Sequence, residues 1–300
     1  MITFFTSPKP FYGKFAVIQR NAIKSWKILH PNVEVILFDD TKEGEKIAEE
    51  LGLILIKEMK KNKYGTPLLN YLFEKAQEIA KNRIMCYINA DIILMKDFLD
   101  AVKIVSKNSK FMLVGRRWDI DLDKEIDFSD GWEKKLKAEV LKKGQLHGEG
   151  GIDYFVFPRN LIKEMPPFAV GRCSFDGWLI YNARKKGIPV IDATEFVMVI
   201  HQNHDYSHVK SPGFSGKFDF KMDNEEYQTN LKLAGKGAYF TLRDANYILT
   251  QKGIKRDLSI TKLHRNIDVL HWLYPYLAPL KVIVKAYINI LKKIGIRRTI

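Results

Sequence analysis

The stretch that decides the fold is residues 83–94, RIMCYINADIIL. Its apolar run, residues 84–88, is short, lies between charged segments, and is rich in β-branched and aromatic residues, which is typical of a central strand in a parallel sheet. The run stops at Asn89-Ala90-Asp91 before Ile92-Ile93-Leu94 resumes it. We therefore expect Asp91 at the carboxyl end of a buried strand, where open α/β sheets bind their ligands.

Two interpretations of Asp91 are open from this stretch. A carboxylate at such a position suits a hard divalent cation, Mg²⁺ or Mn²⁺, held against the oxygens of a diphosphate. The alternative is that Asp91 only caps the turn into the next segment.

Strand and helix patterns alternate on both sides of this stretch. Strands are expected at residues 3–6, 33–38 and 53–56, with amphipathic helices between them. Thr41 is expected to cap the short helix that follows the second strand. Thr66 and Pro67 predict a helix start, because threonine is a common N-cap and proline suits the first helical position. The alternation predicts an α/β fold with a mainly parallel sheet and flanking helices. The chain has no GxGxxG after its first strand and no Walker lysine motif, so it lacks the sequence signatures of dinucleotide-binding and P-loop nucleotide-binding sites.

Composition fits a globular chain of 300 residues with 46% hydrophobic content. With only two cysteines and no signal-peptide pattern at the N-terminus, we expect a cytoplasmic protein without a disulfide framework. The net charge is +14, and residues 262–300 hold eight Lys and Arg against one Asp. We expect residues 1–260 to form the main domain and residues 261–300 a basic, amphipathic helical tail. The tail either contacts anionic lipid at the inner face of the membrane or packs on protein.

Several segments together resemble the nucleotide-diphospho-sugar transferases of GT-A fold, within a little-characterised bacterial and plant-like group. They are YGTPL (64–68), YINADIIL (87–94), GIDYFVFPRNL (151–161), FDGWLIYNARKKGIPVIDAT (175–194), VIHQNHDYSH (199–208), EEYQTNLKLAG (225–235) and TLRDANYILTQKGI (241–254). The resemblance implies a GT-A (Rossmann-like) glycosyltransferase domain. It implies transfer of a hexose or pentose from a nucleoside-diphosphate sugar to a glycan or lipid-linked glycan, as in polysaccharide biosynthesis.

The resemblance also implies a DxD-like motif that binds Mn²⁺ or Mg²⁺ on the donor diphosphate. Here the motif is Asn89-Ala90-Asp91, so Asp91 is the expected anionic ligand and Asn89 contributes an amide. His201 ends a later strand, and we expect it to lie beside Asp91 at the same sheet edge and to complete the metal site. Two alternatives remain: a zinc cluster of His201, His204, Asp205 and His208, or a histidine that only hydrogen-bonds in the core.

Sugar transfer with inversion needs a base for the acceptor hydroxyl. Asp176 is the candidate, because it lies in the first turn of a helix capped by Ser174, where the helix dipole favours its ionised form. Asp153 is the second catalytic candidate, in contact with the acceptor or donor sugar. Nucleotide contacts are expected by position from Thr6, Ser7, Pro8 and Asp39, and from Lys63 and Thr66 at a helix start.

Two other functions compete with this hypothesis. A sugar nucleotidyltransferase shares the fold but should carry a glycine-rich phosphate loop after the first strand, which residues 4–13 do not show. A basic membrane-binding or nucleic-acid-binding module without catalysis would explain only the charge. We expect no nucleic acid partner, and the oligomeric state is not predicted.

Overall fold

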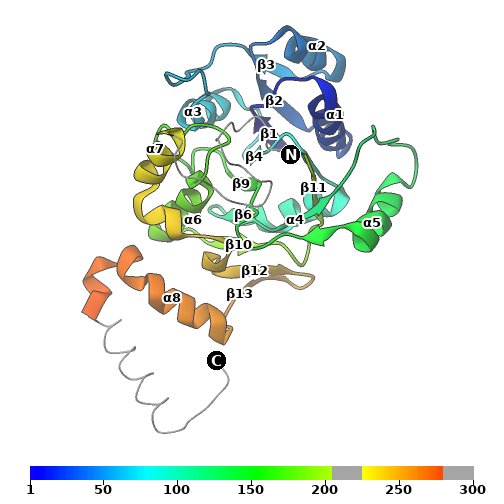
Figure 1. The fold of residues 1–300 in the computed structure, drawn as a ribbon. Helices are drawn as coiled ribbons and strands as arrows, with labels where there is room; N and C mark the ends of the chain where they lie inside the picture. Colours follow the sequence, from blue (N-terminus) through cyan, green and yellow to red (C-terminus); the bar gives the residue numbers. More distant parts are fainter. Residues whose placement is uncertain (205–224, 280–300) are drawn as a thin grey trace.

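The computed structural model describes residues 1–204 and 225–279 and contains one large central sheet (Figure 1). Its nine strands lie in the order β13 (Gly253–Arg256), β12 (Tyr247–Thr250), β10 (Val190–Asp192), β6 (Met112–Val114), β9 (Tyr154–Pro158), β4 (Ile84–Ile88), β1 (Ile2–Thr6), β2 (Glu34–Phe38) and β3 (Ile54–Ile56). The predicted helical tail from residue 280 onwards, like Asp205 and His208, lies outside the described residues.

Most neighbouring strands of this sheet are parallel. β3, β2, β1 and β4 form one parallel block, and β6, β10 and β12 form another. Strand β9 runs antiparallel between the two blocks, and β13 is antiparallel at the edge. The predicted α/β fold with a mainly parallel sheet is confirmed.

Helices cover both faces of the sheet because its strands are apolar on both sides. Phe4 packs in a core with α1 (Gly13–Ile28), α2 (Lys42–Leu51) and α4 (Lys96–Val105). Its neighbour Phe5 points to the other face, which α3 (Leu69–Ile79), α6 (Phe175–Lys185), α7 (Glu225–Ala234) and α8 (Ile260–Leu273) cover. This alternation follows from the two-residue period of a strand.

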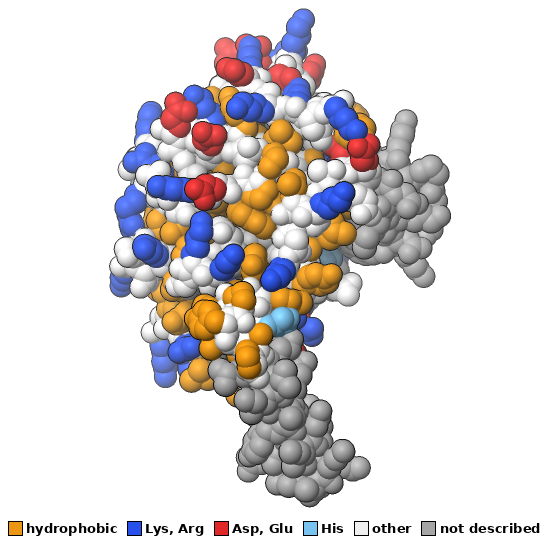
Figure 2. All heavy atoms as spheres, turned by 90° about the vertical axis from the view of Figure 1, so that its left-hand side faces the viewer, with side chains coloured by type: hydrophobic (Ala, Val, Ile, Leu, Met, Phe, Trp, Pro, Cys, Tyr) orange, Lys and Arg blue, Asp and Glu red, His pale blue; other side chains and the backbone are white. Residues whose placement is uncertain are grey.

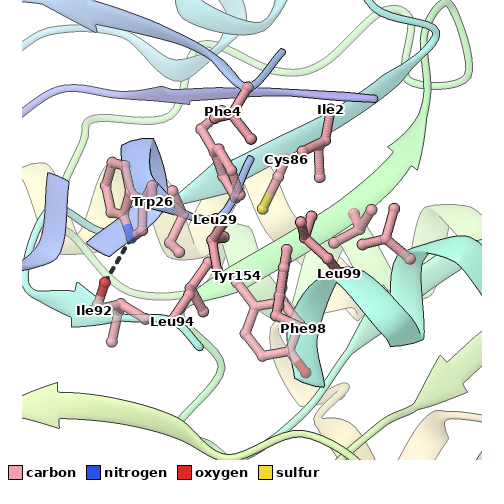
Figure 3. Close-up of a cluster of buried hydrophobic side chains, with 14 of the residues drawn as sticks. Ile2, Phe4, Trp26, Leu29, Cys86, Ile92, Leu94, Phe98, Leu99 and Tyr154 are labelled. Carbon is pink, nitrogen blue, oxygen red and sulfur yellow. Dashed lines mark hydrogen bonds between the residues drawn. The ribbon is translucent and has the colours of Figure 1, made fainter. Parts of the chain in front are cut away.

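Figure 3 shows the first of these cores, in which the ring of Phe4 packs against those of Trp26 and Phe98, with centroid distances of 5.6 and 5.7 Å. The indole Nε1–H of Trp26 donates a hydrogen bond of 2.7 Å to the carbonyl oxygen of Ile92. Helix α1 therefore fixes the backbone that directly follows Asp91.

A second sheet of four short strands lies beside the first. Its order is β5 (Ile92–Ile93), β11 (Val199–Gln202), β7 (Arg117–Ile120) and β8 (Gln145–Leu146), and α5 (Trp132–Lys143) packs on it through Leu136 and Val140. His201 belongs to β11, so the expectation that it shares a sheet with the Asp91 strand is wrong. The chain leaves the central sheet at Asn89-Ala90-Asp91 and enters the second sheet at Ile92.

Two predicted helix caps are also wrong. Thr66 and Pro67 precede a helix that begins at Leu69, because Pro67 pairs with Lys61 and Leu68 with Ala169 in isolated bridges. Ser174 is the N-cap residue of α6 by position, but its side chain makes no capping hydrogen bond. By contrast, Thr41 accepts from the Gly44 N–H and caps α2 as a threonine N-cap does.

The first half of the predicted tail packs on the domain. Val269 and Leu273 of α8 are buried in the same core as α6, and Arg265 pairs with the fully buried Asp244 at 2.8 Å. Asp244 ends the 3-10 helix η2 (Leu242–Asp244), which follows another, η1 (Gly235–Tyr239), and a third, η3 (Pro275–Leu277), follows α8. Within residues 1–204 and 225–279, every helix is too short or too polar to cross a bilayer. The boundary at residue 260 stays a prediction.

Candidate active site

Asp91 occupies the turn between the two sheets, three residues after β4 ends and directly before β5. Its carbonyl oxygen accepts hydrogen bonds from the backbone N–H and side-chain Nε2 of Gln202, at 3.3 and 3.1 Å. These contacts fix the Asp91 backbone against β11. The carboxylate therefore has a defined position beside the histidines of that strand and the segment that follows it.

Two imidazoles converge on this carboxylate. His204 Nε2 lies 3.1 Å and His201 Nε2 3.7 Å from Asp91 Oδ2. One ligand atom from each of these three residues lies within 4.8 Å of the others. The expected closeness of Asp91 and His201 is observed, and His204 joins them.

The donor set fits a divalent cation. The second carboxylate oxygen, Asp91 Oδ1, is buried and has no hydrogen-bond partner in the described part of the chain. A buried carboxylate oxygen without a donor is costly unless a cation or another donor reaches it. Two imidazoles with one carboxylate suit Mn²⁺ and Fe²⁺, and they leave coordination positions open for other oxygens.

The charges around Asp91 favour its ionised form. Burial by itself would raise the pKa of this carboxyl, but His201, His204 and Lys9 hold it well below the ordinary range. The Lys9 amine lies 3.5 Å from ring nitrogens of His204 and reaches the site from the loop after β1. Asp91 is therefore a carboxylate at neutral pH, as a metal ligand must be.

Asp119 supports the site from β7. In the parallel pairing of β7 with β11, Asp119 lies directly opposite His201. Its Oδ1 accepts from His201 Nδ1 at 3.0 Å, and its Oδ2 lies 2.6 Å from Nδ1 of His147, which directly follows β8. Burial opposes the charge, but His147, His201 and Arg117 hold the pKa of Asp119 far below its usual value.

Arg117 joins this cluster to Asp153. Its guanidinium donates to Asp119 Oδ1 at 2.9 Å and to Asp153 Oδ2 at 2.6 Å, and all three side chains are largely buried. Asn89 donates to the other oxygen of Asp153 at 2.6 Å, and its backbone N–H donates to the Asp153 carbonyl. Asn89 therefore binds the chain before β9, while Asp153 has both carboxylate oxygens occupied.

Asp176 lies in the first turn of α6, beside Phe175, whose ring packs edge-on against Tyr87 of β4 at 5.8 Å. Burial raises the pKa of Asp176 to about 6, and the negative charge of Asp153 adds to this, against backbone hydrogen bonds from Gly177 and Ser174. The helix dipole does not decide the charge of this carboxyl, contrary to expectation. A carboxyl with this pKa accepts a proton readily near neutral pH.

The residues expected around a nucleotide fall into two groups. Thr6 ends β1 and Asp39 directly follows the neighbouring β2, and Thr6 Oγ1 and Asp39 Oδ2 are buried without a hydrogen-bond partner among the described residues. Ser7 and Pro8 continue the β1 loop towards Lys9. Burial raises the pKa of Asp39, whose Oδ1 accepts from the Thr41 N–H.

Lys63 and Thr66 form the second group, and they are not at a helix start. Lys63 is exposed and pairs with Glu225 at 2.5 Å, where Tyr64 also contacts the same carboxylate. The Thr66 N–H donates to Asn62 Oδ1 within the loop. Both residues lie before α3 rather than at its first turn.

Sequence reasoning missed two residues of this cluster, Asp119 and His147, and underrated two others. The charged pair Arg116-Arg117 beside Trp118 is typical of a solvated strand end, and His204 enters only as part of the zinc alternative. Side chains alternate between the two faces of a strand, so Arg117 and Asp119, two residues apart, could have been placed on the same face of β7. Nothing in the local sequence marks His147, because its role comes from the pairing of β8 with β7.

The solved structures that this chain resembles include glycosyltransferases. One is a mannosyltransferase from Pyrobaculum calidifontis in complex with GDP-Man and Mn²⁺, at 14% identity and TM-score 0.43, covering 68% of this chain and 57% of that one. Another is glucosyl-3-phosphoglycerate synthase from Mycobacterium tuberculosis. Its complex with Mn²⁺, UDP and glucosyl-3-phosphoglycerate matches at 14% identity and TM-score 0.44, covering 79% and 80%.

The chain thus spans less than two thirds of the mannosyltransferase. No protein-family model matches the sequence, and no curated protein does. Both TM-scores lie below 0.5, so neither structure carries its function over to this chain.

Proposed function

We propose that this protein is a GT-A glycosyltransferase that moves a sugar from a nucleoside-diphosphate donor to a glycan acceptor with the help of Mn²⁺ or Mg²⁺. The observation that carries the proposal is the meeting of Asp91, His201 and His204 beside the carboxyl end of β4, with one buried carboxylate oxygen left without a partner. These three residues would hold the cation. Bound there, it would stabilise the negative charge that grows on the diphosphate leaving group.

The nucleoside would lie at the carboxyl ends of β1 and β2. Each strand end presents a buried oxygen without a partner among the described residues, Thr6 Oγ1 and Asp39 Oδ2, which are suited to donors on a base or ribose. Ser7 and Pro8 would line the loop that leads from this position to Lys9 and the cation site. Lys63 and Thr66 would contact a phosphate if the loop before α3 bends towards it.

Asp176 would take the proton from the acceptor hydroxyl, which makes the transfer inverting. Its pKa of about 6 keeps it ionised at pH 7 while its basicity exceeds that of an ordinary aspartate. Asp153 would position rather than react, because Arg117 and Asn89 occupy both of its oxygens. Its charge would also help to maintain the basicity of Asp176.

A lipid-linked acceptor at the inner face of the membrane fits the charge distribution. Residues 280–300 contain six Lys and Arg and no acid, and exposed Leu263 and Tyr276 lie on the segment that leads to them. Figure 2 shows hydrophobic and basic side chains together on this side of the molecule. Sedimentation with vesicles of anionic and of neutral lipid tests this part. Equal binding to anionic and neutral vesicles, or binding to neither, would contradict a lipid-linked acceptor.

The proposed function is tested by thermal denaturation with UDP, GDP, CDP and dTDP, each with Mn²⁺, Mg²⁺, Fe²⁺ or no metal. A ligand that binds only the folded state raises the melting temperature, by an amount set by its concentration relative to Kd. We expect one nucleoside diphosphate to act strongly with Mn²⁺ and weakly without it, and Asp91→Ala to abolish the metal dependence. A response to no nucleotide would exclude the glycosyltransferase. A response to Fe²⁺ alone would indicate a different metalloenzyme.

A further inference from the structure

Asp119 is placed to control how His201 presents its ring. The carboxylate lies between two imidazoles and a guanidinium: His201 Nδ1 at 3.0 Å, His147 Nδ1 at 2.6 Å and Arg117 Nε at 2.9 Å. The pairing of β7 with β11 sets the Asp119 and His201 backbones opposite each other. The His201 side chain is almost fully buried, with 4% exposure, so its orientation depends on these neighbours rather than on solvent.

An ionised carboxylate can only accept hydrogen bonds. The His201 nitrogen that faces Asp119 must therefore carry a proton, and in the neutral ring the other nitrogen, Nε2, then has a free lone pair. That nitrogen lies 3.7 Å from Asp91 Oδ2. The lone pair is thus directed to the place where a cation would be shared with Asp91 and His204.

We propose that Asp119 is a positioning residue that fixes the Nδ1–H tautomer of His201 and so prepares Nε2 for the cation; the metal part of this inference rests on the function proposed above. A carboxylate that accepts a hydrogen bond from the ring nitrogen of a metal-binding histidine opposite the metal commonly contributes about 10- to 100-fold to metal affinity. The same carboxylate anchors Arg117, which binds Asp153. Asp119 thereby connects the cation ligands to the chain before β9.

The hydrogen bond from Arg117 determines how the side chain of an Asp119→Asn variant would be oriented. Because Arg117 Nε donates to Oδ1, an asparagine at 119 would keep its oxygen on that side and turn its NH₂ group towards His147. The oxygen would still accept from His201, so the Asp119→Asn variant retains the tautomer and loses only the charge. Asp119→Ala removes both the negative charge and the hydrogen-bond acceptor that fixes the tautomer. A residue that served only to stabilise the fold would give no such difference in metal affinity between variants of equal stability.

Mn²⁺ affinity, followed by the electron paramagnetic resonance of the free ion, tests the metal part. We expect Asp119→Ala to weaken Mn²⁺ binding 10- to 100-fold, and Asp119→Asn to recover most of that loss. The exposed Asp121, just beyond the end of β7, provides the control, and Asp121→Ala should bind as the wild type does. Melting curves without metal verify that each variant is folded. Wild-type affinity in Asp119→Ala, or equal losses in both Asp119 variants, would overturn the inference.

The tautomer itself is measured without any metal, from the ¹⁵N shifts of the imidazole rings at pH 8, with His201→Gln to assign the signal. We expect the Nδ1–H form in the wild type and in Asp119→Asn, and loss of this preference in Asp119→Ala. An Nε2–H ring in the wild type would overturn the inference whether or not Mn²⁺ binds. If the wild type binds no Mn²⁺ but shows the expected tautomer, the proposed metal-assisted function fails and the role of Asp119 on His201 stands.

Discussion

Replacing Asp176 by asparagine should make the protein more stable and less active at the same time. The folded state raises the pKa of this carboxyl from 3.8 to about 6, so the folded protein binds its proton more tightly than the unfolded chain does. Stability from this group is complete below pH 3.8 and is lost as the pH rises through 6. Above that pH the ionised, buried carboxylate costs up to about 3 kcal/mol.

An asparagine removes this cost but also removes a negative charge from the first turn of α6, which is worth about 0.3–1 kcal/mol. We therefore expect Asp176→Asn to raise the free energy of unfolding by about 2–2.7 kcal/mol at pH 7.5. About 1.4 kcal/mol of the gain should disappear by pH 5, where the wild-type carboxyl is largely protonated in the folded state. Urea denaturation at several pH values measures both numbers.

Activity should change in the opposite direction. Release of nucleoside diphosphate from the donor identified by thermal shift should fall by about 10²- to 10⁴-fold in kcat, with little change in donor KM. The wild-type rate should rise with pH up to a plateau above about pH 6. Loss of stability at pH 7.5 with activity retained would refute the reasoning and leave Asp176 as an ordinary helix-stabilising residue.

The control is Glu43, an exposed acid in the first turn of α2. Because it is not buried, Glu43→Gln should only lose the favourable interaction with the helix dipole, about 0.3–1 kcal/mol at pH 7.5. The two substitutions should thus change stability with opposite signs.

Three further predictions concern single residues. His204→Ala should weaken Mn²⁺ binding at least about 10-fold by titration calorimetry, because it removes one of three ligand candidates; unchanged affinity would leave the site to the other two. Arg117→Met should lower the free energy of unfolding by about 3–5 kcal/mol in urea, since it leaves the buried Asp153 and the partly buried Asp119 without the guanidinium that pairs with both. A loss below about 1 kcal/mol would show that these ion pairs contribute little to stability. Gly177→Ala should cost about 1–3 kcal/mol in the same assay, because its Cβ would lie 2.5 Å from the carbonyl oxygens of Gly237 and Phe240; Gly148→Ala, where a Cβ meets nothing within 4 Å, should cost far less.

The central sheet could be predicted because its signals are local. The apolar run before Asn89, the alternation of strands with amphipathic helices and the cap at Thr41 are read within about ten residues, and the structure has all of them. Failures came where non-local contacts replaced a local preference. Thr66 and Pro67 have the composition of a helix start, yet bridges from Lys61 to Pro67 and from Leu68 to Ala169 hold that segment extended.

The sequence by itself determined that a carboxylate, Asp91, closely follows a buried strand and that a histidine, His201, lies near the end of a later one. Both features follow from the periodicity and the turn residues of short segments. Only the tertiary structure decided that His201 belongs to a second sheet, opposite Asp119, and that Arg117 connects Asp119 to Asp153. These neighbours are separated by up to 82 residues in the chain. Strand pairing sets which side chains meet across a sheet, and that register depends on the packing of the whole fold rather than on the sequence near any one residue.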